Sequence, residues 1–190
     1  MIILASASPR RRELLDLLGI THEVRPSDID EIREPGERPD NFARRAAEDK
    51  ARHVAQNTKS PVLAADTVVA LGDQSLGKPV DEDDAKRMLR ILSGREHAVH
   101  TGMALALGGR CHSLVDTAIV RFSPLNEDLI DWYVATGEPM DKAGAYAVQG
   151  AGGLLVRSIT GSPQTVIGLP INRLPELFTG LGLAIPLGSP

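Results

Sequence analysis

Serine and arginine side chains gather near the start of the chain, where Ser6 and Ser8 precede the run Arg10–Arg12. Ser8-Pro9 is typical of a helix start, with the serine as N-cap and the proline as the first helical residue. The helix dipole disfavours cations in a first turn, by about 0.3–1 kcal/mol for each exposed arginine, unless an anion lies among them. Hydroxyl groups, free backbone N–H groups and guanidinium groups together favour a phosphate site. The alternative is a capped helix with solvated arginines.

A second candidate for chemistry is Asp66, which interrupts the apolar run Val62–Leu71 and is followed by Thr67. The run predicts a strand buried on both faces. A buried charge is costly unless it is paired, hydrogen-bonded or bound to metal, so the sequence favours a catalytic or metal-binding carboxylate. The alternative is an acid at a strand end that caps a neighbouring loop. The turn Gly72–Ser75 predicts a hairpin, which would bring Lys78 near Asp66 unless Lys78 is an ordinary loop lysine.

Lys50 and the acidic loop Pro26–Pro39 each have two interpretations. Lys50 lies on or beside the apolar stripe of a predicted helix over 40–56. A lysine there more often extends to solvent, but it can also reach inward to a partner. The loop, which includes Glu31, is either solvated or turns one carboxylate inward to hold a metal ion.

Gln149 lies in the glycine-rich stretch 141–153, which contains neither a Walker A pattern nor GxGxxG. Glycine lets a backbone approach a ligand closely, and an amide both donates and accepts hydrogen bonds. Gln149 therefore suits the reading of a base edge, and the open alternative is a connection with an exposed glutamine. The spacings of His97, His100 and His112 match no zinc pattern, so we expect these residues to be structural or exposed.

The elements that must position these residues mix strands and helices. Apolar runs predict strands at 2–5, 21–25, 62–71, 97–107, 110–122, 154–159 and 165–167, with a short returning strand after Gly72–Ser75. Helices are predicted from Ser8 to Gly19, over 40–56 and 81–92, from Ser123 or Asn126 to Gly137, and after 168–170. Pro175 falls inside the last of these and should kink or split it.

The composition bounds the class of protein. The chain has 190 residues, 42% hydrophobic and 24% charged, which predicts one soluble domain over 1–190 with a loose tail at 181–190. A net charge of −4 and 3% aromatic residues argue against nucleic-acid binding. Cys111 is the only cysteine, which excludes an internal disulfide. We see neither a membrane-spanning run nor a signal peptide, so we expect a cytoplasmic protein.

Several motifs together resemble those of the Maf family, and the resemblance covers Ile3 to about Phe178. The motifs are Leu4-Ala5-Ser6-x-Ser8-Pro9-Arg10-Arg11, Ala65-Asp66-Thr67-Val68-Val69, Gly77-Lys78-Pro79, Asp141-Lys142-Ala143-Gly144-Ala145-Tyr146 through Gln149-Gly150, and Gly168-Leu169-Pro170. The resemblance implies a mixed α/β fold like that of the inosine-triphosphatase (Maf/Ham1) group. In that fold an elongated sheet is flanked by helices and two lobes surround a central cleft.

The resemblance also implies an activity. Maf proteins hydrolyse nucleoside triphosphates between the α- and β-phosphates with a divalent cation, Mg²⁺ or Mn²⁺, and the family suggests a homodimer. The subfamily acting on dTTP and UTP has Arg, Thr and Gln at three specificity positions, which match Arg11, Thr67 and Gln149. The sequence does not rank dTTP, UTP, CTP and modified pyrimidine triphosphates as substrates. The sequence departs from the family at Asp49 and Ala147, where Glu and Gly are usual. Pro175 is also unexpected in its helix.

The residues and the resemblance lead to one hypothesis for the mechanism. The ion bridges phosphate oxygens and carboxylates, with Glu31 beside Asp66. Asp66 takes a proton from the attacking water or orients the water through the metal. The charge on the phosphates is stabilised by Arg11, Lys50 and Lys78. The phosphate site is completed by Ser6, Ser8 and Arg10. The pyrimidine is bound by Thr67 and Gln149, with help from Arg11. The rivals are a nucleotide-binding regulator of cell division and a phosphatase that releases orthophosphate.

Overall fold

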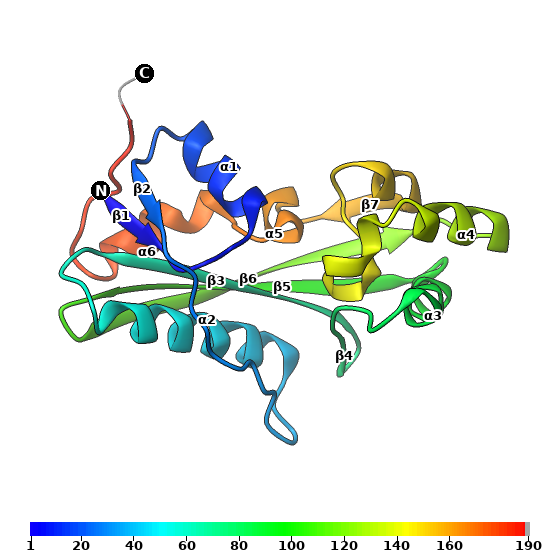
Figure 1. Cartoon of the computed structure of the whole chain (residues 1–190), viewed down its shortest axis with the longest axis horizontal. Coiled ribbons are helices and arrows are strands. Elements are labelled where there is room, and N and C mark those ends of the chain that lie inside the picture. The colour runs from blue at the N-terminus through cyan, green and yellow to red at the C-terminus, as the bar shows by residue number, and fades with distance from the viewer. Residues whose placement is uncertain (189–190) are drawn as a thin grey trace.

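The computed structural model describes residues 1–188, and its centre is a mixed sheet of seven strands (Figure 1). Along the sheet the strands are β2 (His22–Val24), β1 (Ile2–Leu4), β3 (Val62–Leu71), β5 (Glu96–Leu107), β6 (Arg110–Phe122) and β7 (Val156–Thr160). A further strand, β4 (Gln74–Leu76), pairs with β3. β1 is parallel to both β2 and β3, whereas the other pairs are antiparallel. The fold is therefore mixed α/β with helices beside an elongated sheet, as predicted.

One edge of β3 is left open in its middle. β5 pairs with the other edge along nearly the whole strand. On the open edge, β1 pairs with residues 62–63 and β4 with residues 69–71. Residues 64–68 have no strand partner there within the described chain, and these residues include Asp66 and Thr67. The hairpin that the sequence predicts is thus present, and the gap between β1 and β4 leaves room for a site.

Helices cover both faces of the long strands (Figure 1). α2 (Pro39–Ala55) lies along one face, and α1 (Pro9–Leu17), α5 (Pro163–Ile167) and α6 (Leu174–Thr179) lie on the other. α3 (Glu82–Leu92) and α4 (Glu127–Ala135) lie at the far end of the sheet. α2 approaches β5 so closely that a Cβ atom on Gly102 would lie 2.1 Å from the carbonyl oxygen of Ala43. Only glycine fits at this crossing.

Two large apolar cores lie at the two ends of the sheet, and the same strands serve both. β3 and β5 contribute Leu63 and Leu105 to the first core, which α1 and α6 also line. The same strands contribute Val69 and Val99 to the second core, beside α3 and α4. A third cluster, rich in alanine, packs between α2 and the sheet, so the predicted apolar stripe of that helix is buried. The cavity described below lies between the two large cores.

Two predictions near the C-terminus are decided by proline. The strand predicted at 165–167 is wrong, because Pro163 opens a short helix and Gly168, with φ of +113°, ends it. Proline at the first helical position outweighs the strand preference of the β-branched residues that follow. The split predicted at Pro175 is confirmed, since a 3₁₀ helix, Ile171–Arg173, is followed by α6 with Pro175 in its first turn.

Residues 181–188, predicted to form a tail, contain no helix or strand. Their apolar members Leu181, Leu183 and Ile185 nevertheless pack against the first core. The final two positions of the predicted tail, 189–190, lie outside the described residues. Within residues 1–188, every helix is too short or too polar to cross a membrane.

Candidate active site

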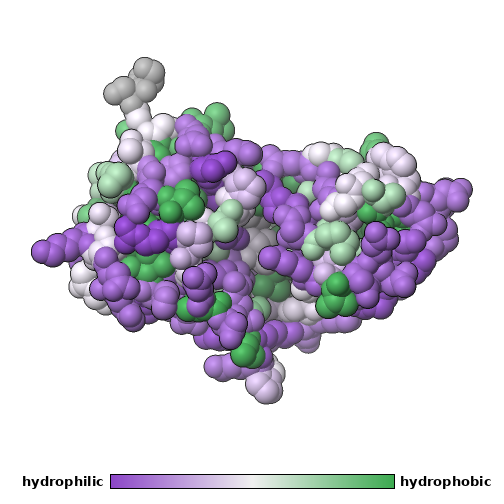
Figure 2. All heavy atoms as spheres, in the orientation of Figure 1, coloured by the Kyte–Doolittle hydropathy of each residue, from purple (hydrophilic) through white to green (hydrophobic). Residues whose placement is uncertain are grey.

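A cavity of about 730 Å³ opens along the unpaired part of β3, in the hollow between the two ends of the molecule (Figure 2). It is lined by every residue that the sequence singled out for catalysis, metal or substrate: Ser6, Ser8, Arg10, Arg11, Glu31, Lys50, Asp66, Thr67, Lys78 and Gln149. These residues come from segments far apart in the sequence, including α1, α2, β3 and the glycine-rich stretch. The fold therefore brings the predicted site residues to one place.

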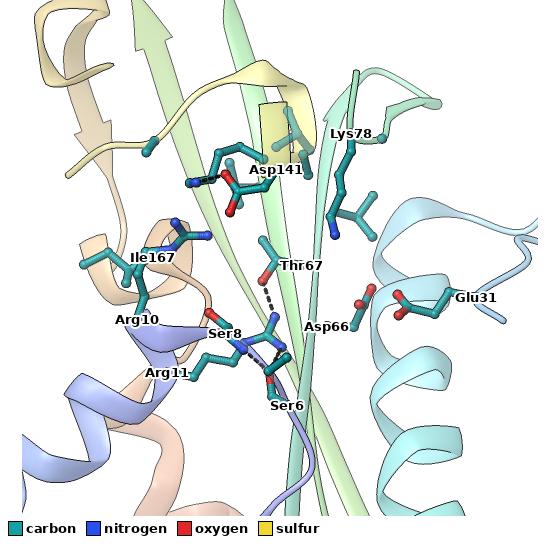
Figure 3. A pocket seen from close by; sticks show the side chains of 18 of the residues that line it. Ser6, Ser8, Arg10, Arg11, Glu31, Asp66, Thr67, Lys78, Asp141 and Ile167 are labelled. Atoms are coloured by element: carbon teal, nitrogen blue, oxygen red, sulfur yellow. Dashed lines mark hydrogen bonds and ion pairs between the residues drawn. The ribbon is translucent and has the colours of Figure 1, made fainter. Parts of the chain in front are cut away.

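Arg11 is held by the fold itself. Its Nε donates to the carbonyl oxygen of Gly168 (2.9 Å), and its Nη1 donates to the carbonyl oxygen of Ala65 (2.7 Å) and to Ser6 Oγ (2.9 Å). Its Nη2 donates to Thr67 Oγ1 (3.3 Å; Figure 3). Because a guanidinium has five N–H groups, at most one remains for a ligand. Arg11 therefore turns inward and bonds to the open edge of β3. The alternative interpretation, in which it is a solvated arginine on a capped helix, is wrong for this residue.

Lys50 also reaches inward, which is the less common of its two predicted positions. Its Nζ lies 2.8 Å from Asp66 Oδ1 and 2.6 Å from Glu31 Oε1. Lys50 and Asp66 are 8% and 7% exposed, so these charges interact with little screening by water. The loop before α2 does turn one acid inward, and that acid is Glu31. One lysine with two carboxylates leaves the cluster with a net negative charge.

The two carboxyl groups have different proton affinities. Burial alone would raise the pKa of Asp66, but Lys50, a hydrogen bond with Glu31 and Arg11 together lower it below its ordinary value. Burial raises the pKa of Glu31, and the neighbouring Asp66 raises it further, while Lys50 only partly opposes this. Glu31 therefore holds a proton more readily than Asp66. As the pH rises, Asp66 is therefore the first of the two carboxyl groups to lose its proton.

A phosphate-sized anion has donors near the start of α1. Ser8 is the N-cap, but its side chain makes no capping bond, and its backbone N–H donates to Ser6 Oγ (3.2 Å). The helix N-terminus and these hydroxyls face the cavity together with Arg10. Lys78 points into the cavity from the segment after β4 (Figure 3). Arg12, by contrast, is exposed and does not line the cavity.

Hydrogen bonds to Tyr133 and Glu138 hold both sides of the loop that carries Gln149. The Tyr133 hydroxyl donates to Glu138 Oε1 (2.8 Å). This phenol and this carboxylate accept bonds from three N–H groups of the loop, those of Ala147 (3.1 Å), Ala151 (3.0 Å) and Gly152 (2.9 Å). The backbone on either side of Gln149 is thereby fixed at the cavity wall. Sequence reasoning missed both residues, since a lone Tyr and a lone Glu carry no motif signal.

Three other residues named in the sequence analysis lie in or near the site. Asp141 and Lys142 pair with each other and line the cavity, and Lys142, with Arg10, holds the pKa of Asp141 below its ordinary value. Both lie in a motif that the sequence analysis quoted, so the motif could have indicated them. Asp49, the departure next to Lys50, pairs instead with Arg45 at 3.4 Å and lies outside the cavity lining.

The carboxyl groups of the site suit a divalent cation whose coordination is completed by the substrate. Residues 1–188 contain no group of three or more His, Cys, Asp or Glu side chains that could hold a metal ion. Mg²⁺, however, is often held by one or two carboxylates together with substrate phosphates. Asp66 and Glu31 offer two adjacent carboxyl groups with an excess of negative charge, which suits such a cation.

Comparison with known proteins gives consistent results. A family model described as "Maf-like protein" matches residues 1–181. The chain is 49% identical to a dTTP/UTP pyrophosphatase of Anaeromyxobacter dehalogenans strain 2CP-C, with 100% of this chain and 98% of the relative covered. It is 48% identical to a dTTP/UTP pyrophosphatase of Myxococcus xanthus, with 98% and 95% covered. A solved HAM1 protein from Coxiella burnetii aligns with a TM-score of 0.46 at 21% identity, over 64% of this chain and 72% of the other.

Proposed function

Because the chain belongs to the Maf family, we propose that it is a nucleoside-triphosphate pyrophosphatase that hydrolyses dTTP and UTP to the monophosphate and pyrophosphate. Relatives named for this activity match the chain over nearly its full length at 44–50% identity. The observation that carries the proposal is the buried pair Lys50 and Asp66, joined by the more exposed Glu31, beside the serine-lined start of α1. Such a site suits phosphoryl chemistry on a triphosphate.

Asp66 is the proposed proton acceptor for the attacking water. It is ionised in the free protein, which leaves it ready to accept, although its lowered pKa makes it a weak base. The negative charge of a bound triphosphate raises the pKa of a nearby carboxylate and thereby strengthens it as a base. Lys50 fixes the position of the carboxylate through its 2.8 Å contact.

Asp66 and Glu31 would hold the divalent cation, Mg²⁺ or Mn²⁺. When bound, such an ion stabilises negative charge on the phosphate oxygens as a Lewis acid. The protein contributes its own positive charge through Lys50, Lys78 and Arg10. Ser6 and Ser8 add hydroxyl donors, and Thr67 and Gln149 bind the pyrimidine with the remaining N–H group of Arg11.

A product assay tests the proposal directly. Purified protein, Asp66→Asn and the matched control Asp49→Asn are incubated with Mg²⁺ and dTTP, UTP, CTP, GTP or 7-methyl-GTP. We expect pyrophosphate and monophosphate from dTTP and UTP, with a loss of roughly 100-fold or more in the Asp66 variant alone. Near-full turnover by Asp66→Asn would refute its role. Tight binding without turnover would favour a regulator of cell division, and release of orthophosphate would favour a metabolite phosphatase.

We further propose that residues 1–190 act as one domain, in the cytoplasm and as a homodimer. The continuous sheet supports the single domain, since β3 and β5 contribute to both large cores. The resemblance to the family supports the homodimer, and dTTP and UTP are nucleotides of the cytoplasm. A net charge of −4 supports a free nucleotide as partner, in preference to a nucleic acid.

A further inference from the structure

A row of polar side chains crosses the sheet away from the open edge, beginning at Thr67. Thr67 on β3 is paired in register with Thr101 on β5, and Thr101 is paired in register with Asp116 on β6. Side chains of directly paired residues lie on the same face of a sheet, so these three form one continuous row. Thr101 is 0% exposed and cannot touch a ligand itself. Its hydroxyl lies within hydrogen-bond distance of Thr67, which lines the cavity.

The short helix α5 lies over this row and is tied to it. The Thr101 hydroxyl donates to the backbone carbonyl oxygen of Thr165 (2.7 Å). The Thr165 hydroxyl donates to Asp116, which also accepts a bond from Arg173 Nη1 (3.1 Å). Thr165 is 0% exposed, so its carbonyl oxygen depends on the bond from Thr101. The Thr165 carbonyl oxygen is the acceptor for the Thr101 proton. Thr165 is held in place both by this bond and by the bond from its own hydroxyl to Asp116.

The direction of each hydrogen bond follows from counting protons. A hydroxyl group has one proton, and a carbonyl oxygen can only accept, so the Thr101 proton is committed to Thr165. The Oγ1 atoms of Thr67 and Thr101 lie 2.9 Å apart, and in this bond Thr67 must be the donor. Thr67 Oγ1 also accepts a bond from Arg11 Nη2 (3.3 Å). Its proton is thus used inside the protein, and Thr67 Oγ1 can offer a ligand only a lone pair.

We propose that Thr101 is a specificity-determining positioning residue, which fixes Thr67 as a hydrogen-bond acceptor toward the base. Thymine and uracil carry a hydrogen on ring nitrogen N3, whereas cytosine has an unprotonated N3 that itself needs a donor. A Thr67 without a free proton satisfies the first two bases and leaves N3 of cytosine unpaired. In Figure 3, Thr67 lies between the carboxylates of Asp66 and Glu31 and the apolar Ile167, where a base can follow the phosphates. This inference rests on the proposed function.

The test compares UTP with CTP, which differ only in the base. The values of kcat/KM for both are measured for the wild type, Thr101→Val, Thr101→Ser and the control Thr117→Val, which changes an exposed threonine on β6. Valine keeps the size of threonine but cannot accept the Thr67 proton, which frees that proton for cytosine. We expect the UTP-to-CTP preference to fall about tenfold in Thr101→Val, as for one mismatched buried hydrogen bond. It should stay at the wild-type value in Thr101→Ser and Thr117→Val.

The outcomes separate a specificity role from a structural one. If Thr101→Val lowers both substrates by the same factor, or leaves the preference unchanged, the inference is overturned. If Thr101→Val does not fold, Thr101→Cys replaces it, because a thiol keeps a weak donor for Thr165 but is a poor acceptor for Thr67. If the wild type releases no pyrophosphate, the proposed function fails by itself. Calorimetric binding of the α,β-imido analogues of UTP and CTP to the same variants then tests the inference independently.

Discussion

Replacing Arg11 by lysine tests whether this arginine is part of the fold as well as of the site. Its guanidinium donates to the carbonyl oxygens of Ala65 and Gly168, two buried residues on different elements, and to the hydroxyls of Ser6 and Thr67. A lysine ammonium is a single point and cannot reach both carbonyl groups. A buried acceptor that loses its donor costs about 1–3 kcal/mol. With one carbonyl and one further acceptor left unpaired, Arg11→Lys should lower the free energy of unfolding by about 2–6 kcal/mol.

The assay is equilibrium unfolding in urea at neutral pH, without nucleotide. Arg12→Lys is the matched control, because Arg12 is exposed and adjacent in sequence, and its effect should stay within about 0.5 kcal/mol. The slope of the transition should be unchanged in both variants, so that the shift in midpoint reports stability alone. An Arg11→Lys protein as stable as the Arg12→Lys control would refute the assignment of Arg11 to the fold. It would leave the arginine as a ligand group only.

Two further predictions concern regions outside the cavity. His97 is buried and contacts the Tyr146 hydroxyl at 2.8 Å, and burial lowers its pKa to about 4 from 6.5. Only the unfolded chain binds a proton there between these values, so stability falls as pH drops, by about 2 kcal/mol from pH 7 to pH 5. Urea titrations at both pH values should show this loss of stability in the wild type and a smaller loss in His97→Gln. Equal losses in the two proteins would contradict the assignment of the loss to His97. In the same assay, Gly102→Ala should lower the free energy of unfolding by about 1–3 kcal/mol, because its Cβ would lie 2.1 Å from the Ala43 carbonyl oxygen. A variant as stable as the wild type would show instead that α2 can shift.

The sequence predicts the strongly patterned parts of this protein well. The run around Asp66 predicts both the strand and the presence of partners for its buried charge, and Lys50 and Glu31 are those partners. The sequence does not decide that Lys50 turns inward, because an apolar helix face is compatible with either direction of a long side chain. That choice depends on Asp66, which is brought close only by the tertiary fold.

The parts that the sequence does not reveal depend on pairing register and on isolated residues. Thr101 and Asp116 become neighbours of Thr67 only through the alignment of three strands, which no local pattern specifies. Glu138 accepts hydrogen bonds from backbone N–H groups, which every residue except proline carries, so no sequence pattern indicates these contacts. At 165–167, the strand preference of the residues predicts the wrong element because a proline two positions earlier begins a helix.

The sharing of β3 and β5 between the two large cores has a mechanical consequence. The walls of the cavity are not separate bodies joined by a linker, because hydrogen-bonded strands run from one wall to the other. A change in the width of the cavity must therefore change the twist of the sheet, which strains many bonds at once. Adjustments as a nucleotide enters or leaves fall instead on the segment at the rim that lies outside the sheet and before α2, residues 26–38. The cavity thus has a stiff frame with one adjustable edge, and substrates are selected by fit to a largely preformed space.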